Sequence, residues 1–171
     1  MCKVLRYSLP VLWVLAVRGW ADAQAPSVPR ELAPPESAKL AFHAHGRGEQ
    51  IYVCKESGGQ AAWAIKAPRA ELLGPDGVPI GSHFAGPTWE GKDGSRVIGK
   101  AIASVSSPDT NSIPWLLISA VNHEGEGVMA EITAIQRLNT KGGKAPSSGC
   151  DVTHLQAESS VRYEADYYFY R

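Results

Sequence analysis

The chain has 171 residues, of which 44% are hydrophobic, and it carries 17 basic and 17 acidic residues. This length predicts one domain with a substantial core, because two domains with cores of their own need a longer chain. The balanced charge excludes the strongly basic surface that is typical of proteins that bind nucleic acid or anionic membranes. We therefore expect no nucleic acid among the partners.

The first 23 residues have the pattern of a secretory signal peptide. A short cationic start precedes an apolar run over residues 7–17, and Ala21-Asp22-Ala23 is a small-x-small cleavage signature. The run is too short for a stable bilayer span, so we expect cleavage after Ala23, a retained anchor being the alternative. Starting from 17 of each sign, cleavage removes three basic residues and one acidic residue, which leaves 14 and 16. The mature protein is expected to be secreted, to a periplasm or outside the cell, without integral membrane association.

Residues 24–38 predict a disordered, Pro-rich leader. This segment contains four prolines and almost nothing apolar to bury. An all-β domain is predicted over residues 39–171. It begins with an alternating segment in which Leu40, Phe42 and Ala44 share one face, as expected for a half-buried strand.

Turn signals divide the rest of the domain into strands. Gly74-Pro75-Asp76-Gly77 and Asp93-Gly94 predict turns, because Pro presets φ and Gly adopts positive φ. The strand after the second turn is predicted to direct these residues inward: Val97, Gly99, Ala101, Ala103 and Val105. Residues 114–118 form a continuous apolar run, which predicts a strand buried on both faces.

The C-terminal third continues the alternation. Apolar residues at every second position over residues 128–134 predict a strand, with a short helix over residues 130–138 as the alternative. Residues 161–170 are β-branched and aromatic, which favours a final strand. About eight strands at short intervals predict an all-β, single-domain antiparallel β-sandwich or small barrel with long loops.

Cys54 and Cys150 remain after cleavage of the signal peptide, and we expect them to form one disulfide that staples the domain. An even number of cysteines in an exported protein is typical of disulfides. Closing a loop of about 96 residues stabilises the fold by roughly 4–5 kcal/mol in the chain-entropy model. Two unpaired buried thiols are the alternative, and the lack of Cys-x-x-Cys argues against a structural zinc site.

Several blocks, found in one order along the chain, together resemble a known family. They are Gln50-Ile51-Tyr52-x-Cys54, residues 81–95, Ile113-Pro114-Trp115-Leu116-Leu117, Gln136-Arg137-x-Asn139-Thr140-x-Gly142-Gly143-x-Ala145-Pro146, Cys150-Asp151 and Tyr163-x-Ala165-Asp166-Tyr167-x-Phe169. The chain resembles the domain of unknown function 3455 family, a group of exported bacterial and fungal proteins. The resemblance covers nearly the whole mature chain, and it implies no established activity. Some fungal relatives carry a malate dehydrogenase label, but this sequence has no Gly-x-Gly-x-x-Gly between a strand and a helix.

Residues 81–95 are the main candidate site, because Gly and Pro punctuate a stretch that is rich in polar and aromatic side chains. His83 could act as a general base if Glu90 or Asp93 folds back to it. In the alternative interpretation, His83 is a structural histidine bonded to a nearby carbonyl or carboxylate, and Asp93 only closes a turn. Trp89, together with His83, is the ligand-binding candidate, because an aromatic ring in a polar loop can stack on a sugar.

His43, His45 and Glu49 are the candidates for a metal site. Two histidines at alternate positions of a strand point to the same face, and the run His-x-His-x-x-x-Glu resembles the first metal motif of cupins. The glycines that flank that motif and its second histidine block are missing. We therefore expect no metal and no cofactor.

These residues leave two functions open. The leading expectation is a secreted, non-enzymatic binding or surface-associated module that recognises carbohydrate or cell-envelope material. It rests on the signs of export, the aromatic and polar loop, and the absence of a complete catalytic set. The alternative is a small secreted hydrolase that uses His83 with Glu90 or Asp93.

Overall fold

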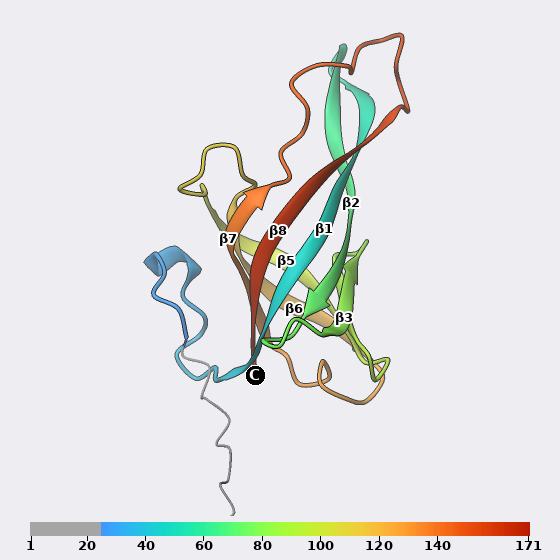
Figure 1. The fold of residues 1–171 in the computed structure, drawn as a ribbon. Helices are drawn as coiled ribbons and strands as arrows, with labels where there is room; N and C mark the ends of the chain where they lie inside the picture. The colour runs from blue at the N-terminus through green and yellow to red at the C-terminus, as the bar shows by residue number, and fades with distance from the viewer. Residues whose placement is uncertain (1–24) are drawn as a thin grey trace, which may run out of the picture.

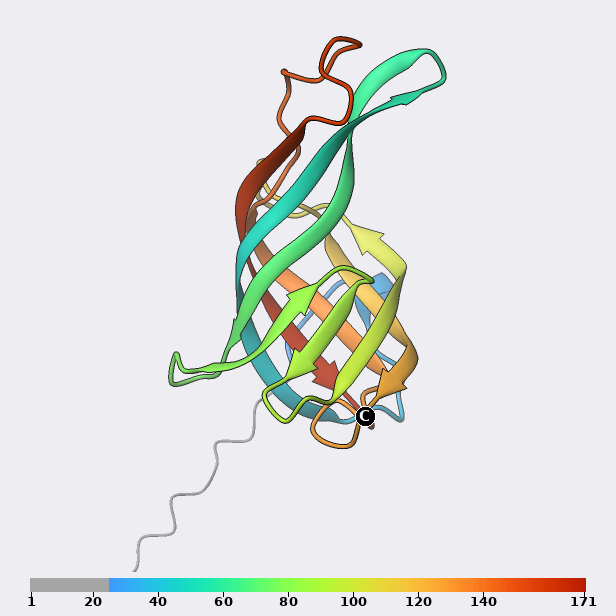
Figure 2. The ribbon, with the colours of Figure 1, turned by 90° about the vertical axis from the view of Figure 1, so that its right-hand side faces the viewer.

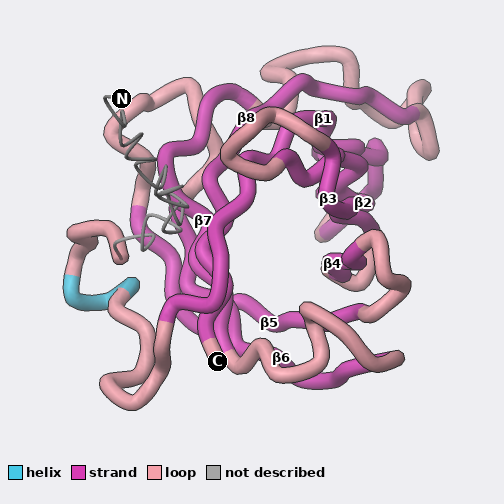
Figure 3. Tube along the Cα trace, turned by 60° about the horizontal axis from the view of Figure 1, so that its bottom comes forward, coloured by secondary structure: helices cyan, strands magenta, loops and turns pink. Residues whose placement is uncertain are grey.

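Eight antiparallel strands wrap into a closed barrel in the computed structural model, which describes residues 25–171 (Figure 1, Figure 2). In chain order the strands are β1 (Leu40–Ser57), β2 (Gln60–Leu73), β3 (Pro79–Phe84), β4 (Thr88–Gly91), β5 (Arg96–Val105), β6 (Trp115–Glu124), β7 (Ala134–Gly142) and β8 (Glu158–Tyr170). Each strand pairs with the next, and β8 pairs with β1 to close the sheet around the interior seen in Figure 3. The predicted all-β class is confirmed in its barrel form, whereas the predicted signal peptide lies outside the described residues.

Strands β1 and β8 form the longest wall of the barrel, and they pair from Leu40 opposite Tyr170 to Val53 opposite Glu158. Alternation sorts their side chains between the two faces, as the period-two pattern predicts. Ala44 and Tyr167 lie opposite each other, and both are fully buried in the interior. Gly46 continues this row, and a Cβ there would lie 2.5 Å from the Tyr167 ring, so only glycine leaves room for that ring.

Large apolar side chains fill one end of the barrel, around the start of β1, the end of β8 and the connection between β6 and β7. Phe42 stacks on Phe169 with 4.3 Å between the ring centroids. Phe169, Met129 and Ile132 are almost completely buried in the same cluster. We call this region, defined by these four residues, the packed end. Full burial of each such side chain contributes about 1.5–3 kcal/mol to folding.

A second apolar cluster lies on the outer face of the sheet, where the short 3-10 helix η1 (Arg30–Leu32) covers β6 and β7. Leu32 is fully buried against Leu117 and Leu138. Its carbonyl accepts a hydrogen bond of 2.7 Å from Gln136 Nε2. The expectation that residues 24–38 have almost nothing to bury is therefore wrong at Leu32, because this one side chain completes the outer cluster.

The first part of strand β6 lies between the two clusters and is buried on both faces, as predicted from the apolar run over residues 114–118, whereas residues 121–124 are exposed. Ile118 belongs to the interior cluster and Leu117 to the outer one. Its neighbour β5 follows the predicted alternation only as far as Ala101. A bulge between Ala101 and Ala103 shifts the register, so Ala103 and Val105 pack in the outer cluster instead of facing inward.

The segment before β7 also differs from the prediction. Residues 125–131 form bends and turns, and β7 begins only at Ala134. The carboxylate of Asp93 accepts a hydrogen bond of 2.8 Å from the Val128 amide, and the Ser95 hydroxyl accepts one of 3.1 Å from the Met129 amide. These side chains satisfy the amides that a strand would have paired, so neither the predicted strand over residues 128–134 nor the alternative helix begins there.

Cys54 and Cys150 form the predicted disulfide, with 5.3 Å between their Cα atoms. The bond joins β1 to the connection between β7 and β8, residues 143–157. It lies near the long β1–β2 hairpin that rises from the barrel in Figure 2. Disulfides are typical of oxidising compartments outside the cytoplasm, and this bond is consistent with such a location. Within residues 25–171, no helix is long and apolar enough to cross a membrane.

Candidate functional site

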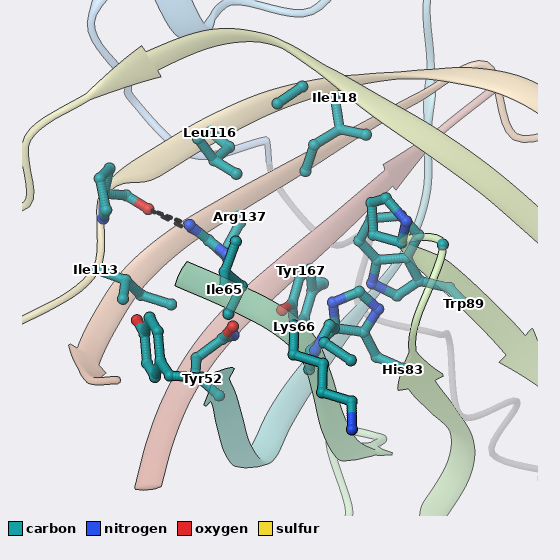
Figure 4. Close-up of a pocket in the computed structure, with 17 residues that line it drawn as sticks. Tyr52, Ile65, Lys66, His83, Trp89, Ile113, Leu116, Ile118, Arg137 and Tyr167 are labelled. Carbon is teal, nitrogen blue, oxygen red and sulfur yellow. Dashed lines mark hydrogen bonds between the residues drawn. The ribbon is translucent and has the colours of Figure 1, made fainter. Parts of the chain in front are cut away.

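Beyond the packed end, the barrel interior holds a cavity of about 580 Å³ (Figure 4). All eight strands contribute to its wall, and most of the lining side chains are apolar. No aspartate or glutamate of the described chain lines it. The volume lies within the range of about 300–1,000 Å³ that is typical of small-molecule sites.

The short β3–β4 hairpin leaves this cavity a mouth. Strands β3 and β4 have 6 and 4 residues, whereas the flanking β2 and β5 have 14 and 10. The hairpin turn lines the cavity through Gly86 and Pro87, and the flanking strands line it through residues 65–68 and Ala101. Ile65 is 56% exposed at this level. The wall is therefore incomplete above the hairpin turn, and the cavity opens to solvent there.

His83 and Trp89 form the floor of the cavity, and they lie directly opposite each other in the β3–β4 pair. Their rings stack with 4.3 Å between centroids and an interplanar angle of 9°. Tyr167 meets both rings edge-on, at 5.4 Å from His83 and 5.8 Å from Trp89. Trp89 is 1% exposed, so the exposed platform expected from its polar loop is not formed. The indole faces the interior because alternation in this short hairpin directs positions 83 and 89 inward.

His83 is held as a neutral imidazole. Its pKa is lowered to about 3, mainly by burial and to a smaller extent by the nearby Arg137 charge, while the hydrogen bond to the Thr88 carbonyl opposes both effects. Nδ1 lies 2.9 Å from the Thr88 carbonyl oxygen, which can only accept, so Nδ1 carries the proton and donates it. Nε2 is then an acceptor in the neutral ring. This arrangement matches the interpretation of His83 as a histidine bonded to a nearby carbonyl.

The structure does not bring Glu90 or Asp93 to His83. Glu90 lies opposite Ser82 on the outer face of the hairpin and forms an ion pair with Arg96. Asp93 closes the β4–β5 turn, where it accepts hydrogen bonds from the Ser95 amide at 3.0 Å and the Ser95 hydroxyl at 2.6 Å. These bonds lower the pKa of Asp93. The base and carboxylate pair expected for a hydrolase is not assembled, because adjacent positions of a strand face opposite sides of the sheet.

Arg137 supplies a fixed cation to the wall of the cavity. It lies on β7 opposite Leu116, and its Nε and Nη2 donate to the Pro114 carbonyl at 3.2 and 2.9 Å. A guanidinium has five N–H donors, so three remain after these two bonds. None of the ion pairs formed among residues 25–171 involves Arg137. The charge therefore lies in the cavity wall without a carboxylate partner from the described chain.

The polar groups around Arg137 are neutral. Burial raises the pKa of the Tyr52 and Tyr167 phenols, so both stay protonated at neutral pH. The Tyr52 hydroxyl donates to the Gly143 carbonyl at 2.6 Å, and the Tyr167 hydroxyl lies 3.2 Å from that of Tyr163. Nε2 of Gln50 is buried in the cavity wall without a hydrogen-bond partner in the described chain. None of these groups compensates the arginine charge.

The metal candidates lie outside the cavity, on the outer face of β1. His45 Nδ1 lies 3.0 Å from a carboxylate oxygen of Asp166, and His43 Nε2 lies 3.6 Å from the same oxygen. Glu49 instead pairs with Arg69 at 2.7 Å. The three candidates therefore do not converge, and within residues 25–171 no group of three metal-binding side chains is assembled.

The comparisons with known proteins place the chain in a family. A family model described as "Protein of unknown function (DUF3455)" matches residues 34–171. The chain belongs to the DUF3455 family. No curated protein and no solved structure matches it. The resemblance drawn from the sequence blocks is confirmed, and the family description adds no activity.

Sequence reasoning gave no role to Arg137, although it lies in a block that carries the DUF3455 resemblance. In the sequence, Gln136 and Leu138 flank it, and both are buried on the outer face beneath η1, whereas Arg137 itself is half-buried. Alternation alone could not tell which face of β7 is the interior. The usable signal was a charged residue within a strand whose neighbours on both sides are buried, since such a charge needs a partner.

Proposed function

We propose that this DUF3455 protein is a secreted, non-enzymatic binding protein that holds a small apolar molecule inside its barrel. The observation that carries the proposal is the cavity of about 580 Å³, open beside the β3–β4 turn and walled mainly by apolar side chains. A preformed apolar cavity with a few polar groups is the usual form of a small-molecule site. The expected signal peptide and the disulfide support export.

The chemistry of the wall favours binding over turnover. The neutral His83 donates to a backbone carbonyl, and the carboxylates expected to activate it lie elsewhere. Of the ligands expected from the sequence, an apolar envelope component fits the cavity better than a carbohydrate does. The many hydroxyls of a sugar would need polar partners that an apolar wall does not supply.

Fluorescence titration with the uncharged probe N-phenyl-1-naphthylamine tests this proposal. We expect saturable binding of one probe per chain, with the emission increase of an apolar site. Ala101→Trp should weaken binding at least tenfold, because a large ring would fill the mouth. Lys100→Trp is the matched control, since it places the same ring on the neighbouring exposed position, outside the cavity lining.

Thermal unfolding of each variant establishes that it is folded before binding is compared. Absence of probe binding, or equal binding by the Ala101→Trp and Lys100→Trp proteins, would refute the interior site. A bound probe that is recovered chemically unchanged after prolonged incubation agrees with a binding protein. Hydrolysis of an apolar ester at the same site would contradict it.

A further inference from the structure

We infer that the molecule held in the cavity is an apolar monocarboxylate whose carboxylate binds the Arg137 guanidinium. This inference rests on the proposed function and adds the charge and the head group of the ligand. The observation behind it is that the cavity wall holds a positive charge without a negative charge of the described chain beside it. A fixed cation and several neutral donors line the cavity, and no acidic side chain of residues 25–171 does.

The guanidinium is oriented before a ligand arrives. The Pro114 carbonyl accepts from Nε and Nη2 at 3.2 and 2.9 Å, which fixes the plane of the group. Carboxylates bind such a planar fork through two parallel hydrogen bonds, which a spherical cation cannot match. A fixed fork loses little side-chain entropy on binding.

The other cationic candidates do not take this role. His83 stays neutral, because burial lowers its pKa to about 3. Lys66 lines the mouth, where its ammonium group pairs with Glu158, and it is half exposed. Arg137 is therefore the cation that a ligand inside the cavity would meet.

Arg137 is partly buried in this wall, and its charge has no acidic partner within residues 25–171, so a bound anion would supply the partner that the wall lacks. The amide nitrogen of Gln50 adds a second unpaired donor in the same wall. Most of the remaining lining is aliphatic or aromatic, so the rest of the ligand is apolar. One carboxylate is enough, since Arg137 is the single cation of the cavity wall that has no acidic partner within residues 25–171.

The matched pair 1-pyrenebutyric acid and 1-pyrenebutanol tests the inference, because the two probes share an apolar body and differ in charge. Titration at pH 7 should show the acid binding about 10–100-fold more tightly than the alcohol, as expected for a charge-assisted hydrogen bond. Arg137→Gln should remove this preference while alcohol binding persists. The glutamine amide can still donate to the Pro114 carbonyl, which keeps the local hydrogen bond.

Two further variants keep the result interpretable. Arg137→Lys should retain part of the preference, because it keeps the charge and loses the fork. Arg96→Gln is the matched control: this arginine lies outside the cavity and pairs with Glu90 and Glu124, so the preference should be unchanged. Circular dichroism and thermal unfolding identify any variant that fails to fold, and the comparison then rests on Arg137→Lys.

The failures of the two proposals are distinguishable. If both probes bind equally well to the wild-type chain, the carboxylate inference is overturned and the interior site stands. If Lys66→Gln, rather than Arg137→Gln, removes the preference, the inference is overturned in favour of an anion held at the mouth. If neither probe binds, the proposed function itself fails.

Discussion

The two halves of the barrel interior are built from the same strands and the same alternation, yet one half is filled and the other is hollow. At the packed end, the inward positions carry large apolar side chains such as Phe42 and Phe169, which stack on each other. Around the cavity they carry Gln50, Tyr52 and Arg137, and the hairpin that should complete the wall is short. The alternation of inward and outward side chains therefore makes the barrel. The size and polarity of the inward side chains decide whether a region is filled core or open cavity.

The two halves are also held together differently. The packed end depends on buried apolar area, with Phe169 fully buried. The cavity half depends on specific bonds, which include the Cys54–Cys150 disulfide and the hydrogen bond from Tyr52 to Gly143. This difference can be tested by removing one element at a time.

The largest effect is expected from the double variant Cys54→Ser, Cys150→Ser. The unfolded chain regains the freedom that a 96-residue separation restricts, and the free energy of unfolding should fall by about 4–5 kcal/mol. Urea denaturation of the variant and of the oxidised wild type measures this loss. Hydrogen exchange should increase most in residues 143–157. A uniform increase over the whole barrel would contradict the idea that the bond serves the cavity half.

Phe169→Ala removes a large side chain from the packed end. Removing a fully buried ring should lower the free energy of unfolding by about 3–5 kcal/mol, because a cavity forms where side chains are tightly packed. Urea denaturation measures the change, and N-phenyl-1-naphthylamine binding by the folded variant should be unaltered. Loss of probe binding in the folded variant would mean that the two halves are coupled.

His83→Asn tests the stacked rings of His83 and Trp89, which form the cavity floor next to the packed end. The test uses the pH dependence of the free energy of unfolding. The pKa of His83 is about 3 in the fold and near 6.5 in the unfolded chain. The unfolded state therefore binds a proton first as the pH falls, so stability is complete above about pH 6.5 and declines below it. Between pH 6.5 and 4.5 the loss attributable to this residue is about 2–3 kcal/mol. Urea denaturation at several pH values should show a smaller decline for His83→Asn, and an unchanged decline would assign the effect to other groups.

The smallest effect is expected from Leu116→Ala in the wall of the cavity. Leu116 is half-buried and already borders open space, so its removal creates little new void. The free energy of unfolding should fall by about 1–2 kcal/mol, well below the loss for Phe169→Ala. Urea denaturation of both variants gives the ratio directly. Equal losses would show that the cavity half is packed as tightly as the other end.

The sequence predicted the fold class and the disulfide because both leave local marks: period-two alternation, and an even cysteine count after a start that has the pattern of a signal peptide. It failed where tertiary contacts override the pattern. Alternation continues past Ala101, but a bulge turns Ala103 to the other face. Likewise, alternation over residues 128–132 looks like a strand, but Asp93 and Ser95 hold this segment as a turn.

The candidate site was predicted only in part, for a related reason. His83 and Trp89 were singled out, and both line the cavity, but their polar and Gly-rich surroundings suggested exposure. Their burial depends on Tyr167, which packs against both rings from the far end of the chain. Arg137 was missed because burial on both faces of β7 conceals which side faces the interior. Which residues share a cavity is set by strand register and closure, which no local pattern contains.

The seam between β1 and β8 sets an order of events for a chain that is made from one end to the other. The other strand pairs join neighbours in sequence, whereas the seam brings residue 40 beside residue 170. A nascent chain that stops before β8 has no closed interior, however many of its hairpins have formed. Tyr167, which covers the floor of the cavity, arrives with that last strand. The cavity is thus completed only when synthesis has reached β8, and a ligand of the proposed site would enter through the mouth afterwards or be enclosed as the seam closes.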